Sequence, residues 1–209
     1  MSGNDNVLNA ATILPYYIEF KAKKFGFKSN SAPIRNFHKN EVTDAVFELC
    51  EKFEHRYAKS FEKRCKECAK DNLTQEGYWS ILSQLLDNDL NWGRIIVIFA
   101  FAGALSVDRM RSNCHGDVEI IQDWTCKFMK KHVEKWIAKN NGWDGLVKEK
   151  HREDVARRDK FQRSNILVKM NGLVEFNNKP DEKQNGGWGC LFVSVFIAAC
   201  LRVLLPNHF

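Results

Sequence analysis

The stretch NWGRIIVIFAFAGALSVD at residues 91–108 decides the fold of this chain. From Ile95 to Leu105 it is apolar on every face, and such a helix lies either in a protein core or in a membrane. These eleven residues form roughly 16 Å of helix, at about 1.5 Å per residue, which is too short to cross a bilayer. The stretch therefore predicts a central core helix around which other helices pack.

The first turn of this predicted helix has an unusual composition. Asn91 is a good N-cap, Gly93 is a poor helix former, and Arg94 brings a charge beside the core. This combination indicates that something outside the helix needs a close backbone approach and a fixed cation.

Composition favours one all-α domain with tails. The chain has 209 residues, 44% hydrophobic content and only four prolines, and its apolar residues recur at helical spacing over long segments. The net charge of +6 is mild, and no basic face interleaved with aromatics indicates nucleic-acid binding. Seven irregularly spaced cysteines and a polar N-terminus without a secretory pattern favour a reducing compartment.

Apolar periodicity and capping residues predict six helices. Gly26 ends the first, Thr74 caps the third, and the second is either one long helix or two with a kink. The predicted helices are 13–25, 40–66, 74–86, 91–108, 118–138 and a short last one at 143–147. Residues 148–185 are dense in charge, so we expect low order there with at most one weak helix.

Four segments follow from this pattern. They are a flexible N-terminus at 1–12, a helical domain at 13–150, a charged linker at 151–185 and an apolar tail at 186–209. Trp188–Leu205 carries a single charge, Arg202, and forms about 27 Å of helix, at the short end for a membrane span. The tail is expected to be a membrane anchor inserted after synthesis, and the alternative is a buried helix that docks on the domain.

Four stretches occur in the order found in one known family. They are YYIEFKAKKFGF at 16–27, VTDAVFELCEKFEHRYAKSF at 42–61, LNWGRIIVIFAFAG at 90–103 and WIAKNNGWDGLV at 136–147. They resemble, respectively, the fourth, third, first and second homology motifs of the Bcl-2 (B-cell lymphoma 2) family of apoptosis regulators. One motif alone would be weak, but four in order before an apolar tail are specific.

The resemblance implies a Bcl-2-like all-α bundle around a central hydrophobic hairpin, at 91–108 and 117–138. It implies no catalytic site and no cofactor, so the chain is expected not to be an enzyme. The working surface would be a groove that accepts the amphipathic third-motif helix of another family member, which is helix-in-groove recognition.

Residues carried over from the family would line this groove. Arg94 would offer its fork of donors to an acidic residue of the ligand helix, and Gly93 would let the ligand backbone approach. Asn91 can cap its own helix or contact the ligand, but not easily both. Arg94 could instead pair within its own chain, and the aromatic stripe of the third motif could be core. The predicted groove residues are Phe53, Tyr57, Phe61, Ile81, Leu85, Asn91, Gly93 and Arg94.

The chain also carries its own third-motif (death-motif) helix, in which three positions depart from the family pattern. Glu51 stands where Asp is usual, Cys50 where a smaller residue is usual, and Val46 where Leu is usual. We therefore expect this helix to be a weak ligand for other proteins. Its predicted motif residues are Val42, Val46, Leu49, Cys50, Glu51 and Phe53.

The second motif departs from the family as well. Asn141 replaces a common Gly, and Lys150 sits where an aromatic often closes the groove. Cys65 and Cys68 form a lone C-x-x-C pair with no second pair at zinc spacing, so no metal site is expected.

The family contains survival members that sequester ligand helices and killer members that permeabilise the mitochondrial outer membrane. The N-terminal motif, with Tyr17, Ile18, Phe20 and Gly26, resembles that of survival members, as does FEHRYAKSF at 53–61. The expected function is anti-apoptotic binding of pro-apoptotic relatives through their amphipathic helices. The alternative is a pro-apoptotic effector that oligomerises in the membrane.

The expected partners follow from this function. They are pro-apoptotic Bcl-2 family proteins, with possible homo- or heterodimers, and the mitochondrial or reticular membrane through the tail at 186–209. The domain would face the cytosol, tail-anchored in the mitochondrial outer membrane or the endoplasmic reticulum.

Overall fold

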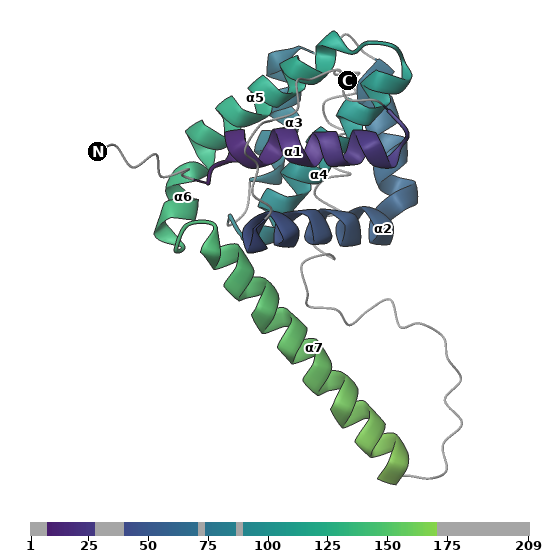
Figure 1. Ribbon diagram of the computed structural model, residues 1–209, viewed down its shortest axis with the longest axis vertical. Helices are drawn as coiled ribbons and strands as arrows, with labels where there is room; N and C mark the ends of the chain where they lie inside the picture. The colour runs from purple at the N-terminus through teal and green to yellow at the C-terminus, as the bar shows by residue number, and fades with distance from the viewer. Residues whose placement is uncertain (1–7, 28–39, 71–73, 87–89, 171–209) are drawn as a thin grey trace, which may run out of the picture.

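The computed structural model describes residues 8–27, 40–70, 74–86 and 90–170, without the side chains of 58–70 and 161–170. All regular elements in these ranges are helices, which confirms the predicted all-α class (Figure 1). The helices are α1 (Ala10–Lys24), α2 (Glu41–Lys70), α3 (Gln75–Leu85), α4 (Trp92–Arg111), α5 (Gly116–His132), α6 (Glu134–Lys139) and α7 (Asp144–Met170).

Helix α4 is the centre of the bundle, as its composition predicts. Every residue from Trp92 to Gly103 is buried, and α1, α2, α3 and α5 all pack against this helix. Figure 1 shows α1 crossing α4, with α2 and α5 on other sides of it. Burial on all faces explains why the sequence of α4 shows no polar stripe.

Helix α1 has clear start and stop signals. Asn9 and Thr12 form a capping box at its N-terminus, and Gly26 follows its end with φ of 83°, a left-handed conformation that favours glycine. The close packing of α1 on α4 depends on Gly103, since a Cβ there would lie 2.6 Å from Cε1 of Tyr17.

Helix α2 is bent. Tyr57 has non-helical backbone angles (φ −115°, ψ 19°) inside an otherwise continuous helix, so the kinked version of the prediction is correct. Before the kink, the buried residues Val42, Val46 and Cys50 face the core, and α2 packs extensively on α4.

The second arm of the predicted hairpin is divided. We predicted one helix over 118–138, whereas α5 ends at His132 and α6 starts at Glu134, with Val133 between them. Trp136 of α6 then packs against Trp92, with ring centroids 5.1 Å apart. The break turns α6 toward the start of the central helix.

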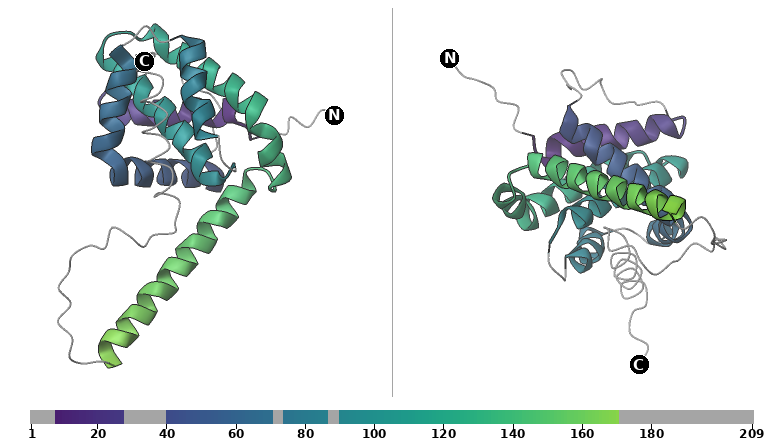
Figure 2. Two further views of the ribbon diagram at one scale, coloured as in Figure 1. Left: turned by 180° about the vertical axis from the view of Figure 1, so that it is seen from behind. Right: turned by 90° about the horizontal axis from the view of Figure 1, so that it is seen from below.

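For the segment after Val147 we expected low order with at most one weak helix, and up to Met170 it forms one long helix. Instead of a short helix followed by low order, α7 is continuous over 27 residues and projects away from the bundle (Figures 1 and 2). Side-chain pairs one turn apart support it, including Lys150 Nζ to Asp154 Oδ2 at 3.3 Å and Arg152 Nη2 to Glu149 Oε1 at 2.6 Å. Such pairs stabilise a helix that lacks a continuous apolar face.

The membrane prediction is not addressed by these helices. None of the helices within the described ranges combines the length and the apolar character that crossing a membrane requires. The tail at 186–209 lies outside the described residues, as do 171–185 of the charged linker.

Candidate functional site

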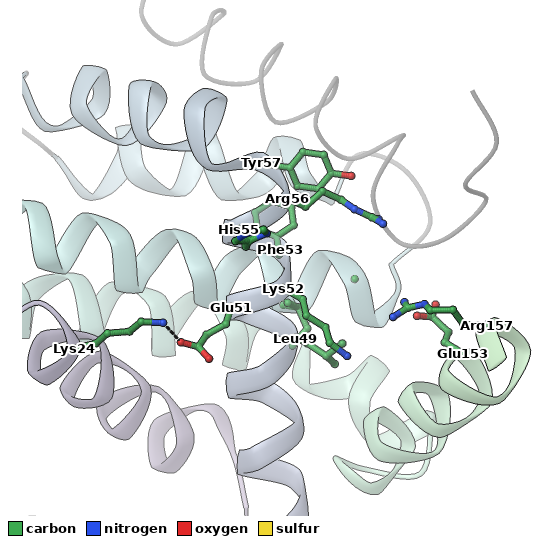
Figure 3. A pocket seen from close by; sticks show the side chains of 12 residues that line it. Lys24, Leu49, Glu51, Lys52, Phe53, His55, Arg56, Tyr57, Glu153 and Arg157 are labelled. Carbon is green, nitrogen blue, oxygen red and sulfur yellow. Dashed lines mark hydrogen bonds and ion pairs between the residues drawn. The ribbon is translucent and has the colours of Figure 1, made fainter. Parts of the chain in front are cut away.

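A cavity of about 520 Å³ opens between α2, the first turns of α4 and the exposed part of α7 (Figure 3). Lys24 at the end of α1 reaches its edge. The lining residues are Lys24, Leu49, Glu51, Lys52, Phe53, His55, Arg56, Tyr57, Gly93, Ile96, Glu153 and Arg157.

The floor of the cavity is apolar. Leu49, Phe53 and Tyr57 come from successive turns of α2, and Gly93 and Ile96 come from the start of α4. The rings of Phe53 and Tyr57 are tilted against each other with centroids 5.1 Å apart, just where α2 bends. Both side chains are half-buried, so the cavity offers aromatic surface to a ligand.

The rim of the cavity is charged. Lys24 forms an ion pair with Glu51, which Figure 3 draws as a dashed line. Lys52 pairs with Glu48 one turn earlier, at 2.5 Å, and its Nζ lies 3.9 Å from Oδ1 of Asp154 on α7. These pairs connect α1 and α7 to opposite sides of α2.

Arginines and one carboxyl complete the rim. Arg56 on α2 and Arg157 on α7 are exposed, and Glu153 lies one turn before Arg157. Burial raises the pKa of the Glu153 carboxyl, and Glu149 raises it further, while Arg157 opposes the shift. The rim therefore has four Lys and Arg side chains against two carboxyls.

Three of the predicted groove residues line the cavity: Phe53, Tyr57 and Gly93. Asn91 caps α4, because its Oδ1 accepts a hydrogen bond of 3.1 Å from the backbone N–H of Arg94. Of the two roles expected for Asn91, the structure displays the capping role.

Arg94 points inward. Its side chain belongs to a residue only 4% exposed, and its Nη1 donates a hydrogen bond of 2.7 Å to the carbonyl oxygen of Leu85. It does not line the cavity. Contact between Arg94 and a ligand helix stays a prediction.

The remaining predicted groove residues lie elsewhere. Ile81 and Leu85 on α3 are each 2% exposed and belong to the hydrophobic core. The side chain of Phe61 lies outside the described residues. Ile96, Arg56 and Arg157 also line the cavity and were not predicted from the sequence. Arg56 lies three residues after Phe53 on the same helix, so helical spacing could have assigned it to the cavity. Nothing in the sequence indicated that Arg157 lies at the cavity.

The chain's own third-motif helix is packed into its own domain. Val42, Val46 and Cys50 are buried, and the Cys50 thiol donates to the carbonyl oxygen of Ile96 with Sγ and O 3.6 Å apart. Leu49, Glu51 and Phe53 face the cavity instead. The six predicted motif residues thus divide between the core and the cavity wall.

A polar cluster holds this helix to α1. Glu54 accepts a hydrogen bond of 2.8 Å from the Tyr17 hydroxyl and forms an ion pair with the buried Lys21. Burial, together with the neighbouring Cys50 and Glu54, raises the pKa of Tyr17 well above its ordinary value of 10.0. Burial also raises the pKa of the Cys50 thiol. Both groups are therefore neutral at physiological pH.

Within the part of the chain that the structure covers, no three His, Cys, Asp or Glu side chains are grouped to hold a metal ion. The side chains of Cys65 and Cys68 are outside that part.

Comparisons with known sequences agree on one family. The family model described as "Apoptosis regulator proteins, Bcl-2 family" matches residues 46–143. Bcl-2-like protein 1 of Sus scrofa is 31% identical over 107 residues, which cover 51% of this chain and 46% of that protein. The match thus spans about half the length of that relative. Apoptosis regulator R11 of Xenopus laevis is 22% identical over 165 residues, or 77% of this chain and 79% of the relative.

Two solved structures share the fold. Chicken BOK superposes with a TM-score of 0.57 at 18% identity, covering 66% of this chain and 92% of that one. Trichoplax adhaerens trBcl-2L2, solved bound to trBak BH3, superposes with a TM-score of 0.58 at 22% identity, covering 67% and 95%.

Proposed function

The chain belongs to the Bcl-2 family of apoptosis regulators, and we propose that its cavity binds the amphipathic third-motif helix of pro-apoptotic relatives. The observation that carries this proposal is the half-buried aromatic pair Phe53 and Tyr57 on an apolar floor beside Gly93. An amphipathic helix binds such a groove through apolar anchors at i, i+3 or i+4, and i+7. The solved relative trBcl-2L2 is bound to a helix of this kind, the BH3 segment of trBak.

We further propose an anti-apoptotic role. Supporting it, the chain's own third-motif helix is held in the domain: Val46 and Cys50 are buried, Lys24 pairs with Glu51, and Lys21 pairs with Glu54. With its own motif helix packed in this way, the domain does not present that helix as a ligand and is suited to receive the helices of others. The opposite function, a membrane-permeabilising effector, would require these contacts to break.

The proposed setting is the cytosolic face of the mitochondrial outer membrane or the endoplasmic reticulum, reached through the apolar tail at 186–209. The support is the sequence alone: eighteen residues from Trp188 to Leu205 with one charge. Heterodimers with ligand proteins would then form at the membrane surface.

Titration of the full chain with a fluorescent trBak BH3 peptide tests the binding proposal. We expect Phe53→Ala and Tyr57→Ala each to weaken binding by about tenfold or more, since buried aromatic anchors dominate such interfaces. Ile120→Ala is the matched control, because Ile120 is 45% exposed on α5 and does not line the cavity. Circular dichroism confirms that each variant is folded. Unchanged affinity in both aromatic variants would contradict the proposed site.

Isolated mitochondria distinguish the two roles. Full chain added before a permeabilising BH3 peptide should reduce the release of cytochrome c, and Phe53→Ala should lose this protection. Increased release with the unaltered chain would refute the anti-apoptotic role and support the effector alternative.

A further inference from the structure

Much of the charge on the cavity rim is satisfied within the protein. Lys24 is neutralised by Glu51, and Lys52 is shared between Glu48 and Asp154. These pairs hold the walls of the cavity together, and their charges are not free to attract a ligand.

Arg56 and Arg157 differ from these lysines. Both line the cavity and are exposed, one on α2 and one on α7 (Figure 3). In the ranges whose side chains the structure describes, neither guanidinium forms an ion pair with a carboxylate. The nearest rim carboxyl on the same helix, Glu153, lies one turn before Arg157, and burial and Glu149 raise its pKa.

The position of Arg157 is determined by contacts between α7 and α2. Lys150 Nζ lies 3.0 Å from Glu48 Oε2, and His151 Nε2 lies 2.9 Å from Glu41 Oε1. With Asp154 near Lys52, these contacts fix the first part of α7 against α2, and Arg157 follows Asp154 by three residues on the same helix. The extension of α7 past Val147 thus brings a cation to the cavity that a shorter helix would lack.

Arg94 follows Gly93 of the cavity floor, but its guanidinium is not exposed to a ligand as those of Arg56 and Arg157 are. Arg94 is 4% exposed and donates to the carbonyl of Leu85, so a ligand carboxylate would have to replace a hydrogen bond inside the core. Arg56 and Arg157 need no such exchange. Guanidinium groups bind carboxylates with two parallel hydrogen bonds, and these are stronger than bonds between neutral groups.

We propose that Arg56 and Arg157 form a cationic clamp that selects ligand helices with acidic side chains beside their apolar anchors. This inference rests on the proposed function and specifies the partner: an amphipathic helix with carboxylates at the edge of its apolar face. The clamp also speeds the encounter with such helices, because complementary charge steers association. Helices with the same anchors and a neutral or basic edge bind more weakly.

Binding of the full chain to two sets of peptides tests the clamp. The probes are the trBak BH3 peptide and variants of it in which each Asp or Glu is singly replaced by Asn or Gln. We expect Arg56→Gln and Arg157→Gln each to weaken binding of the unaltered peptide about three- to tenfold, within the range for rim charges that are partly desolvated on binding. The loss of affinity caused by each arginine variant should be smaller for one of the peptides in which an acid is replaced by its amide. Added salt should weaken peptide binding by the wild type more than by the variants.

Arg158→Gln is the matched control. Arg158 neighbours Arg157 on α7 but does not line the cavity, and its Nε donates to the backbone oxygen of Asp154 at 3.3 Å. This variant removes the same charge and should bind like the wild type. In a charge reversal, the peptide acid whose amide replacement reduces the effect of Arg157→Gln is replaced by Lys. Arg157→Glu should bind this Lys peptide more tightly than the wild type does.

The outcomes separate the clamp from the groove. If Arg56→Gln and Arg157→Gln both bind like Arg158→Gln while Phe53→Ala loses binding, the clamp is wrong and the groove proposal stands. If the unaltered chain fails to bind the trBak BH3 peptide, the groove proposal fails and the clamp fails with it.

Discussion

Nη1 of Arg94 donates a hydrogen bond of 2.7 Å to the carbonyl oxygen of Leu85, the last residue of α3. The last four carbonyls of a helix have no partner in the helix itself, and a cation there also interacts favourably with the helix dipole. The same first turn of α4 is capped by Asn91. Arg94 therefore joins the end of α3 to the start of the central helix.

This role predicts that Arg94→Met destabilises the domain. Methionine keeps the apolar stem but leaves the buried carbonyl of Leu85 without this donor, which costs about 1–3 kcal/mol. Urea unfolding followed by circular dichroism measures the change. Arg158→Gln, on the exposed part of α7, serves as the control and should unfold like the wild type. Equal stability of Arg94→Met and the wild type would show that Arg94 has no structural role.

The cluster of Tyr17 and Glu54 predicts a loss of stability at alkaline pH. Because burial raises the pKa of Tyr17 above 10.0, the neutral hydroxyl is favoured in the folded state. The stabilisation is fully present below about pH 10 and is lost as the pH rises from there toward the raised pKa, with a slope of at most about 1.4 kcal/mol per pH unit. Urea unfolding between pH 9 and 11 measures this slope.

Tyr17→Phe isolates the contribution of the hydroxyl. This variant has no ionisable group at position 17, so its free energy of unfolding should fall less steeply over the same pH range. At pH 9 it should already be less stable than the wild type, because it lacks the hydrogen bond from the Tyr17 hydroxyl to Glu54. Parallel slopes for the variant and the wild type would assign the pH dependence to other groups.

The sequence predicted the parts of the fold that hydrophobicity determines. The run from Ile95 to Leu105 can only be core in a helix of its length, and α4 is indeed buried on all sides. The kink of α2 was left open, because the apolar stripe continues through Tyr57 on both sides of the bend. Periodicity reports the face of a helix but not its local bending.

The parts that failed depend on polar contacts between distant segments. No apolar stripe runs along α7, and the pair between Lys150 and Glu48 becomes visible only once α7 lies on α2. The inward direction of Arg94 likewise depends on where α3 ends. Arg157 could not be assigned to the site because only a weak helix was expected in its segment, and nothing in the sequence indicated that this helix would lie against α2.

The ion pair between Glu48 and Lys150 predicts a small but measurable coupling of α7 to the bundle. Their closest atoms are 3.0 Å apart, and the side chains are 45% and 16% exposed, so solvent screens the interaction. A double-mutant cycle with Glu48→Gln and Lys150→Met should give a coupling energy of about 0.5 kcal/mol in low salt. The same cycle in 1 M salt, where the Debye length is about 3 Å, should give less. A coupling that is absent at low salt would mean that other contacts hold α7.

Among the described glycines, Gly145 on α7 is the one at which an added Cβ would lie closest to a neighbouring atom, which predicts a strong mutational effect of adding a side chain there. A Cβ at this position would lie 2.0 Å from the carbonyl oxygen of Asn140 and 2.9 Å from Cζ2 of Trp92. The backbone oxygen cannot rotate away, so either α7 or the turn after α6 must shift. Gly145→Ala should therefore lower the free energy of unfolding by about 1–3 kcal/mol, the usual cost of overpacking.

Gly116 offers a matched control at the start of α5. A Cβ there would meet nothing within 4 Å, so Gly116→Ala should leave the stability unchanged or raise it by about 0.5–1 kcal/mol through helix propensity. Urea unfolding of both variants compares the two glycines directly. Since α7 carries Arg157, Gly145→Ala should also weaken binding of the trBak BH3 peptide, whereas Gly116→Ala should not. Equal stability of the two variants would mean that the turn between α6 and α7 can relax around the added methyl group.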